Sequence, residues 1–163
     1  MRFAFRPLTP ADVEALLAWH YEPPYETYDP GGTPEDAAEM RAAADSPTWF
    51  AVEDPDDGDL IAFVEYIPAE DEVEIGLGLR PDLTGRGIGQ TFAQAVVDDA
   101  RARWPTAHVW LDVFPWNDRA ITVYERLGFV RGDVYLRRFE GGVEHNFLRM
   151  DLPDQAGEAS SAR

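Results

Sequence analysis

Residues 72–104 carry the pattern that decides the fold, and they read EVEIGLGLRPDLTGRGIGQTFAQAVVDDARARW. The first eight residues, Glu72 to Leu79, predict a strand, in which alternate side chains share a face. A glycine-rich turn from Thr84 to Gly89 comes next. Apolar residues then recur on one helical face, which predicts a helix that starts at Gln90 and ends by Pro105.

The glycine-rich turn is a candidate anion site. Glycine allows positive φ and a close approach of the backbone, and the first turn of a helix offers unpaired N–H groups and a positive dipole end. The alternative is a tight turn that binds nothing. The spacing does not fit the dinucleotide fingerprint G-x-G-x-x-G, and the chain has no Lys for a P-loop.

The composition describes a folded and strongly acidic chain. Of its 163 residues, 45% are hydrophobic, which is enough for one core. It has 31 acidic and 14 basic residues, a formal net charge of −17, and every basic residue is an Arg. This balance argues against nucleic acid and against an anionic membrane, since both need clustered basic side chains. The acid excess is either a solvated surface or a field that attracts a cationic substrate.

The residue types that are absent narrow the chemistry further. The chain has no Cys, which excludes disulfides, thiolate metal sites and a cysteine nucleophile. Its three His argue against a multi-His metal site. No apolar run reaches the roughly 18 residues of a membrane span, and the N-terminus has no signal-peptide core. We therefore expect a cytoplasmic protein without a bound metal.

Cap and turn residues divide the rest of the chain into elements. The pattern Thr-Pro-x-Asp at Thr9 and again at Thr33 predicts two helix starts, and Asn117 opens a later helix. The expected strands are 2–7, 49–52, 60–66, 72–79, 108–114, 129–139 and 143–152. This order favours a mixed sheet with helices on both faces. We expect one domain over 1–152 and a frayed polar tail over 153–163.

A second constellation lies downstream, and with the first it resembles a known family. It reads WLDVF at 110–114, NDRA at 117–120 and VYERLGF at 123–129. Together the two stretches resemble the GNAT superfamily of acyl-CoA-dependent N-acetyltransferases, closely over 72–129 and in element order over 2–152. The resemblance includes the N-terminal acetyltransferases of ribosomal proteins. It implies an α/β (α+β) fold with a mixed, mostly antiparallel sheet of about seven strands and helices on both faces.

The resemblance implies acetyl-CoA as co-substrate and assigns its contacts residue by residue. Strand-edge groups would meet the pantetheine arm, the turn amides would wrap the pyrophosphate, and two residues beyond the turn would add contacts. These residues are Leu77, Gly78 and Leu79; Thr84, Gly85, Arg86, Gly87, Ile88 and Gly89; and Thr91 and Asn117. The family usually has Gln or Arg where this chain has Thr84, so a side-chain contact there is in question. Asn117 would also serve as an ordinary N-cap.

The resemblance also implies the acid and base. Tyr124 matches the Tyr that protonates the departing thiolate, although its place on a predicted apolar stripe equally suits a core aromatic. Asp112 interrupts an apolar strand and is the first candidate for the base, followed by Glu74. Glu65, Glu72 and the absence of any dedicated base stay open. Because there is no Cys, we expect direct transfer in a ternary complex.

The acceptor side is the least specified part of the sequence. We expect Tyr25, Tyr28 and Trp116 to hold a cationic amine by their rings, with the stretch 145–147 nearby. The acceptor would be a small-molecule amine or a peptide N-terminus, and a homodimer is possible by analogy with the family. The alternative to an enzyme is an acyl-CoA-binding sensor domain that transfers nothing.

Overall fold

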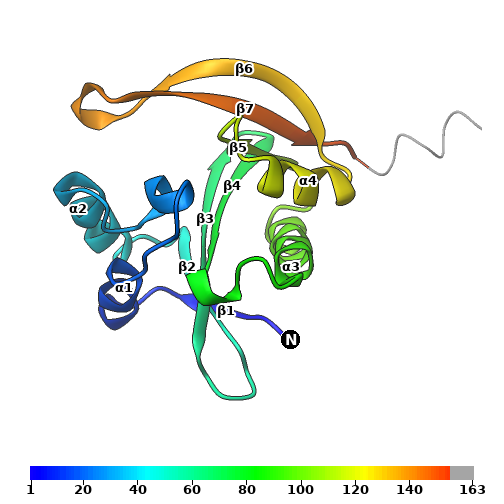
Figure 1. Ribbon diagram of the computed structural model, residues 1–163. Coiled ribbons are helices and arrows are strands. Elements are labelled where there is room, and N and C mark those ends of the chain that lie inside the picture. Colours follow the sequence, from blue (N-terminus) through cyan, green and yellow to red (C-terminus); the bar gives the residue numbers. More distant parts are fainter. Residues whose placement is uncertain (155–163) are drawn as a thin grey trace, which may run out of the picture. The chain divides into compact units, whose positions relative to one another are not determined.

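The computed structural model describes residues 1–154, and within them it has four α-helices and seven strands (Figure 1). The elements are β1 (Ala4–Pro7), α1 (Pro10–Leu17), α2 (Pro34–Ala43), β2 (Trp49–Glu53), β3 (Leu60–Ala69), β4 (Glu72–Leu79), α3 (Ile88–Arg103), β5 (His108–Val113), α4 (Asp118–Arg126), β6 (Val130–Arg138) and β7 (Glu144–Leu152). The strands pair in the order β1-β2-β3-β4-β5-β7-β6 to form a mostly antiparallel sheet, in which β4 and β5 run parallel. The predicted seven-stranded mixed sheet is confirmed.

The internal contacts divide the chain into two compact units. Unit 1 comprises residues 1–66 and 77–92, and unit 2 comprises residues 67–76 and the chain from Ala93 onward. Both β4 and α3 cross the boundary between them. The expectation of one domain over 1–152 stays a prediction.

In unit 1, the two Thr-Pro-x-Asp patterns begin helices as predicted. The Thr9 hydroxyl accepts a hydrogen bond from the amide of Asp12, and the Thr33 hydroxyl accepts one from the amide of Asp36. In each case the Asp carboxylate accepts a hydrogen bond from the backbone N–H of the cap residue, which completes a capping box. The sequence thus fixes both helix starts locally.

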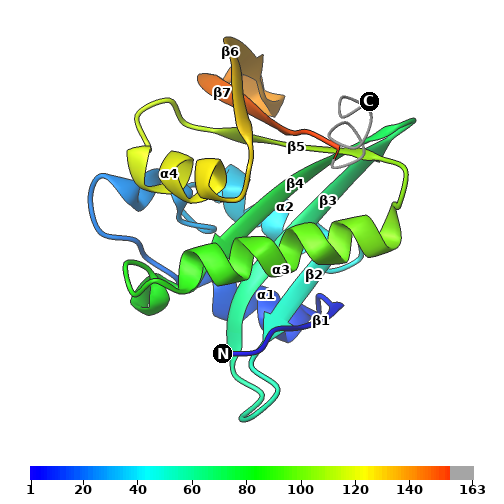
Figure 2. The ribbon, with the colours of Figure 1, turned by 90° about the vertical axis from the view of Figure 1, so that its right-hand side faces the viewer.

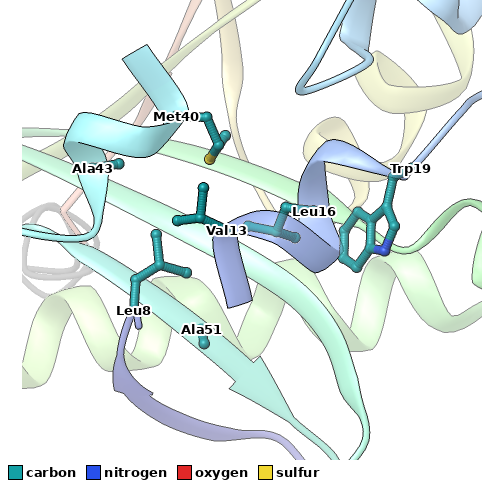
Figure 3. Close-up of a cluster of buried hydrophobic side chains, with 7 residues drawn as sticks. All are labelled: Leu8, Val13, Leu16, Trp19, Met40, Ala43 and Ala51. Carbon is teal, nitrogen blue, oxygen red and sulfur yellow. The ribbon is translucent and has the colours of Figure 1, made fainter. Parts of the chain in front are cut away.

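The core of unit 1 lies where α1 and α2 meet β2 (Figure 3). The helices contribute Val13 and Leu16 from α1 and Met40 from α2, and β2 contributes Ala51. Phe63 of β3 packs against this cluster, and its ring stacks on that of Trp49 with centroids 5.8 Å apart. Burial of this apolar surface is what holds the two helices to the strands.

In unit 2, the side chains of β5 alternate between two environments. Val109, Leu111 and Val113 are buried, whereas the residues between them are half-buried. The hairpin of β6 and β7 continues from β5 through antiparallel pairing with β7. Figures 1 and 2 show this hairpin turned out of the plane of β4 and β5.

The element boundaries differ slightly from those predicted. β1 begins at Ala4, β3 runs on to Ala69, and α3 begins at Ile88, two residues before the predicted start. In α4 the buried side chain is Ile121, whereas the predicted stripe of Ala120, Val123, Tyr124 and Leu127 is only half-buried. Of the predicted tail, 155–163 lies outside the described residues. Within residues 1–154, no helix is long and apolar enough to span a membrane.

Candidate active site

Three glycines of the 84–89 turn leave open space around the backbone. Gly85 and Gly87 have φ of +72° and +78°, a conformation that other residues adopt only with strain. Gly89 has no such φ, yet a Cβ there would meet no atom of the described chain within 4 Å. Neither conformation nor packing therefore explains Gly89. A glycine at this position would let a ligand approach the backbone closely.

The amides of the same turn are available to an anion. Among residues 1–154, no hydrogen bond within the chain engages the amides of Gly85, Arg86 or Gly87. By contrast, the amide and the hydroxyl of Thr84 both donate to the carbonyl of Pro81, at 3.3 and 2.7 Å. The turn leads into the 16-residue α3, whose N-terminus carries a partial positive charge. The exposed guanidinium of Arg86 adds a full positive charge. The free amides and these positive charges together fit a pyrophosphate.

Packing against Phe63 restricts the residue at Gly78, near the end of β4, and the sequence did not reveal this. A Cβ on Gly78 would lie 2.3 and 2.5 Å from two carbons of the Phe63 ring. The packing of Phe63 therefore accounts for glycine at this position without any cofactor. One residue on, the Tyr21 hydroxyl donates a 2.7 Å hydrogen bond to the carbonyl of Leu79. Leu77 is half-buried beside them, and exposed Thr91 lies in the first turn of α3.

The loop 21–29, called the tyrosine loop below, carries the predicted acceptor residues Tyr25 and Tyr28 and is held in part by the carboxylate of Asp29. Asp29 accepts a 2.8 Å hydrogen bond from the amide of Tyr21 and lies 3.0 Å from Nδ1 of His20. Tyr25 and Tyr28 begin and end a short 3-10 helix, and both rings are half-buried. The loop is therefore ordered both by the contacts of Asp29 and by the hydrogen bond from Tyr21 to Leu79.

In unit 2, the two candidate bases lie together. A single guanidinium nitrogen of Arg137 bonds Glu74 Oε1 at 2.6 Å and Asp112 Oδ2 at 2.9 Å. The Tyr135 hydroxyl also donates to Asp112 Oδ2. The side chains of Asp112 and Glu74 are 5% and 12% exposed. The other carboxylate of β4, Glu72, is held instead by Arg149 at 3.0 Å.

One oxygen of this cluster has no partner. Asp112 Oδ1 is buried, and no hydrogen bond reaches it from any residue of the described chain. A buried polar atom of this kind is rare in folded proteins and requires an explanation. Burial and the hydrogen bond to Asp112 raise the pKa of Tyr135 to about 12, so Tyr135 stays a protonated donor at neutral pH.

The second motif forms the start and end of α4. Asn117 is 6% exposed and caps the helix, since its Oδ1 accepts from the amide of Ala120 at 3.2 Å. This confirms the N-cap and leaves the cofactor contact a prediction. The ring of Tyr124 lies 5.8 Å from that of Phe129, centroid to centroid. Gly128 adopts a φ of +99°, as expected just beyond a helix end.

An aromatic cluster lies just beyond the end of β5, with Phe114 in contact with three other rings, among them Trp116. Trp116 is 44% exposed and stacks on Phe114 with centroids 5.5 Å apart. Phe114 in turn stacks on Phe147 at 4.8 Å and meets the edge of His145 at 5.5 Å. The stretch 145–147 was expected near the acceptor, but Phe114 was missed. Phe114 directly follows β5 and continues the alternation of Trp110 and Asp112, which was the available signal.

The structure thus gathers the predicted site residues in separate groups. Unit 1 holds the turn, the end of β4, the tyrosine loop and Glu65. Unit 2 holds the carboxylates of Glu72, Glu74 and Asp112, together with Asn117, Tyr124 and Trp116. Tyr135 and Arg137 were missed altogether, because their partners are set by tertiary register and no local pattern shows it.

Comparison with known proteins gives one family and several relatives. Residues 2–130 match the family described as "Acetyltransferase (GNAT) domain". The chain is 38% identical over 104 residues to a streptothricin acetyltransferase of Streptomyces lavendulae, a match that covers 62% of this chain and 53% of that protein. It thus spans about half the length of that relative. The chain is 25% identical over 138 residues to the spermidine N(1)-acetyltransferase of Escherichia coli K12, a match that covers 83% of this chain and 73% of that protein.

Solved structures show the same fold. A chimaeric spermidine N-acetyltransferase from Vibrio cholerae aligns with a TM-score of 0.70 at 21% identity and covers 93% of this chain and 95% of its own. A GNAT-family acetyltransferase from Bacillus anthracis also aligns with a TM-score of 0.70, at 18% identity.

Proposed function

Because this chain belongs to the GNAT family of acetyltransferases, we propose that it transfers the acetyl group of acetyl-CoA to a primary amine of a small cationic molecule. The observation that carries the proposal is the glycine turn at 84–89, with its free amides and the unexplained Gly89. These features fit the pyrophosphate of the co-substrate, because free backbone amides at a helix N-terminus are a common phosphate-binding site.

The co-substrate contacts follow from the fit of the turn. The amides of Gly85, Arg86 and Gly87 and the first turn of α3 would hold the pyrophosphate, with Thr91 near its start. Backbone groups of Leu77, Gly78 and Leu79 would hold the pantetheine arm. Acetyl-CoA, when bound, supplies an acetyl group already activated as a thioester.

The proton transfers are assigned to unit 2. The amine nucleophile must lose a proton as its N–C bond forms and the C–S bond breaks, and Asp112 is our first candidate to accept it. Glu74 is the second candidate, although its Oε1 is already bonded to Arg137. Tyr124 would donate its phenol proton to the departing thiolate, which is possible because a phenol has a pKa of about 10 against about 8.5 for a thiol. With no Cys in the chain, we propose direct transfer without an acyl-cysteine.

Charge and aromatic surface support a cationic acceptor. The chain carries a net charge of −17, which attracts polyamine-like cations and slows the approach of anions. In unit 2, the half-exposed ring of Trp116 can contact an ammonium by cation–π interaction. In unit 1, the rings of Tyr25 and Tyr28 can do the same. The relatives named for spermidine and streptothricin also act on cationic amines. A peptide N-terminus and a homodimer stay predictions.

Release of free CoA thiol in the presence of a panel of amines tests this proposal. We expect turnover with one or more polyamines or amino-bearing cations, and none with neutral alcohols of the same length. Trp116→Ala should raise the KM for the amine several-fold and leave the KM for acetyl-CoA unchanged. Binding of acetyl-CoA without thiol release for any amine would instead support the sensor domain, and turnover with peptides alone would replace the small-molecule acceptor.

A further inference from the structure

The hydrogen-bonded cluster of unit 2 comprises Glu74, Asp112, Tyr135 and Arg137. It spans strands that are not all neighbours in the sheet. The strand order places β5 and β7 between β4, which carries Glu74, and β6, which carries Arg137. Neighbouring strands are about 4.8 Å apart, so a flat sheet would separate β4 from β6 by about 14 Å. The long side chains of Arg137 and Glu74 extend toward each other from these two strands, and a guanidinium nitrogen of Arg137 lies 2.6 Å from Oε1 of Glu74. Figure 1 shows the β6–β7 hairpin turned out of the plane of β5.

Two side chains from β6 reach Asp112 and both use the same oxygen. The Tyr135 hydroxyl and the Arg137 guanidinium donate to Oδ2 and leave Oδ1 without a partner in the described chain. Because both donors bond the same oxygen, they fix the orientation of the Asp112 carboxylate. Rotation about its Cβ–Cγ bond would break two charge-assisted hydrogen bonds. The buried and unpaired Oδ1 is then the one position that a donor from outside the chain can fill.

We propose that Tyr135 and Arg137 are positioning residues for acetyl transfer, which hold Asp112 by Oδ2 so that Oδ1 receives the proton of the amine. This inference rests on the proposed function, in which Asp112 is the base. The proton passes from the amine nitrogen to Oδ1, directly or through one water molecule, as the N–C bond forms. Neither β6 residue needs to touch the substrate.

The charged groups around Asp112 come from three neighbouring elements. Asp112 faces Glu74 from β4, Tyr135 and Arg137 from β6, and Arg149 directly opposite in register on β7. Arg149 bonds Glu72 and Asp151, and its guanidinium lies 4.0 Å from the centroid of the Trp110 ring. Arg149 therefore also bonds two carboxylates on the same face, as Arg137 does, but it does not bond Asp112. It supplies a matched control.

A double-mutant cycle in the thiol-release assay tests the inference. Tyr135→Phe should lower kcat by about 10-fold with an unchanged KM for acetyl-CoA, since it removes a donor and keeps the ring. In an Asp112→Asn background, the same change should cost less than about 2-fold, because Tyr135 acts only through Asp112. Arg149→Gln should have the same effect in both backgrounds. Arg137→Lys, which keeps the charge, repeats the cycle if Tyr135→Phe does not fold.

The outcomes separate this inference from the proposed function. If the Tyr135 and Asp112 effects multiply, or if Asp112→Asn keeps full kcat, the positioning role is overturned while the acetyltransferase stands. If the wild-type protein releases no thiol with any amine, both proposals fall. Thermal unfolding of each variant shows whether a loss of kcat follows a loss of fold.

Discussion

The Tyr21 hydroxyl donates a 2.7 Å hydrogen bond to the main-chain carbonyl of Leu79, which joins the tyrosine loop to the end of β4 within unit 1. This bond couples a predicted acceptor loop to a predicted cofactor strand. Removing the hydroxyl with Tyr21→Phe should lower the free energy of unfolding by about 1 kcal/mol. We also expect the KM for acetyl-CoA to rise several-fold, because the strand end is no longer held.

Steady-state kinetics and urea unfolding of Tyr21→Phe check this expectation. His20→Ala is the control, since it alters the neighbouring residue, whose side chain is 76% exposed, without touching Leu79. A variant that loses stability but keeps the wild-type KM would show that the bond serves the fold alone.

Gly78 should be required by packing. An added Cβ would lie 2.3 Å from the Phe63 ring, which itself packs on Trp49 and Trp19. Gly78→Ala should therefore destabilise the protein by about 1–3 kcal/mol, as over-packed cores do. Thermal unfolding measures the loss. Gly89→Ala is the control, because its Cβ meets open space, and it should cost no stability. Equal effects at the two positions would contradict this assignment.

Local signals in the sequence were enough for most of the fold. The capping boxes at Thr9 and Thr33, the positive-φ glycine at Gly128 and the hairpin turn before β7 each place an element boundary within a few residues. These signals work because each depends on atoms close together in the chain. The early start of α3 was missed because glycines favour a turn, whereas Ile88 and Gly89 already adopt helical structure.

Asp12 should make stability depend on pH in acid. The hydrogen bond from Arg6, with those from Thr9, outweighs burial and lowers the pKa of Asp12 to about 2, against about 3.9 in an unfolded chain. Because the folded pKa is the lower one, the stabilisation is complete above about pH 4 and is lost as pH falls toward 2. It should amount to about 2 kcal/mol at neutral pH.

Unfolding of Asp12→Asn and wild type at several pH values measures this difference. We expect the difference in free energy of unfolding between the two proteins to be largest at pH 7 and to disappear between about pH 4 and pH 2. Asp36→Asn removes the equivalent capping-box residue of α2. This residue is exposed and has no Arg partner among residues 1–154, so the effect should be smaller. A gap that persists unchanged at pH 2 would contradict the role of the Asp12 charge.

Tyr124 should affect turnover rather than binding. If its phenol protonates the departing thiolate, Tyr124→Phe should lower kcat by about 10² or more, with little change in the KM for acetyl-CoA. The ring contact with Phe129 is kept in the variant, so stability should change little. Steady-state thiol release checks both parameters. Near-normal turnover would remove the acid assignment.

The candidate site was only partly visible in the sequence. Motif spacing pointed to Asp112 and Glu74 separately, and the structure shows that Arg137 joins them. That contact joins two side chains that are 63 residues apart in the chain, and no local pattern encodes it. For the same reason Tyr135 could not be recognised. The packing cause of Gly78 was hidden too, because Phe63 lies on a different strand.

The central claim is that the glycine turn binds acetyl-CoA, and calorimetric titration of acetyl-CoA into wild type and Gly89→Glu tests it most directly. Glu at the start of α3 suits a helix N-terminus and meets open space, so the fold should keep its stability. Its charge and bulk should oppose the pyrophosphate. Gly89→Gln, of the same size without the charge, separates the two effects. We predict micromolar binding by wild type, weaker binding by Gly89→Gln and none by Gly89→Glu. Equal binding by all three proteins, or none by folded wild type, would contradict the account.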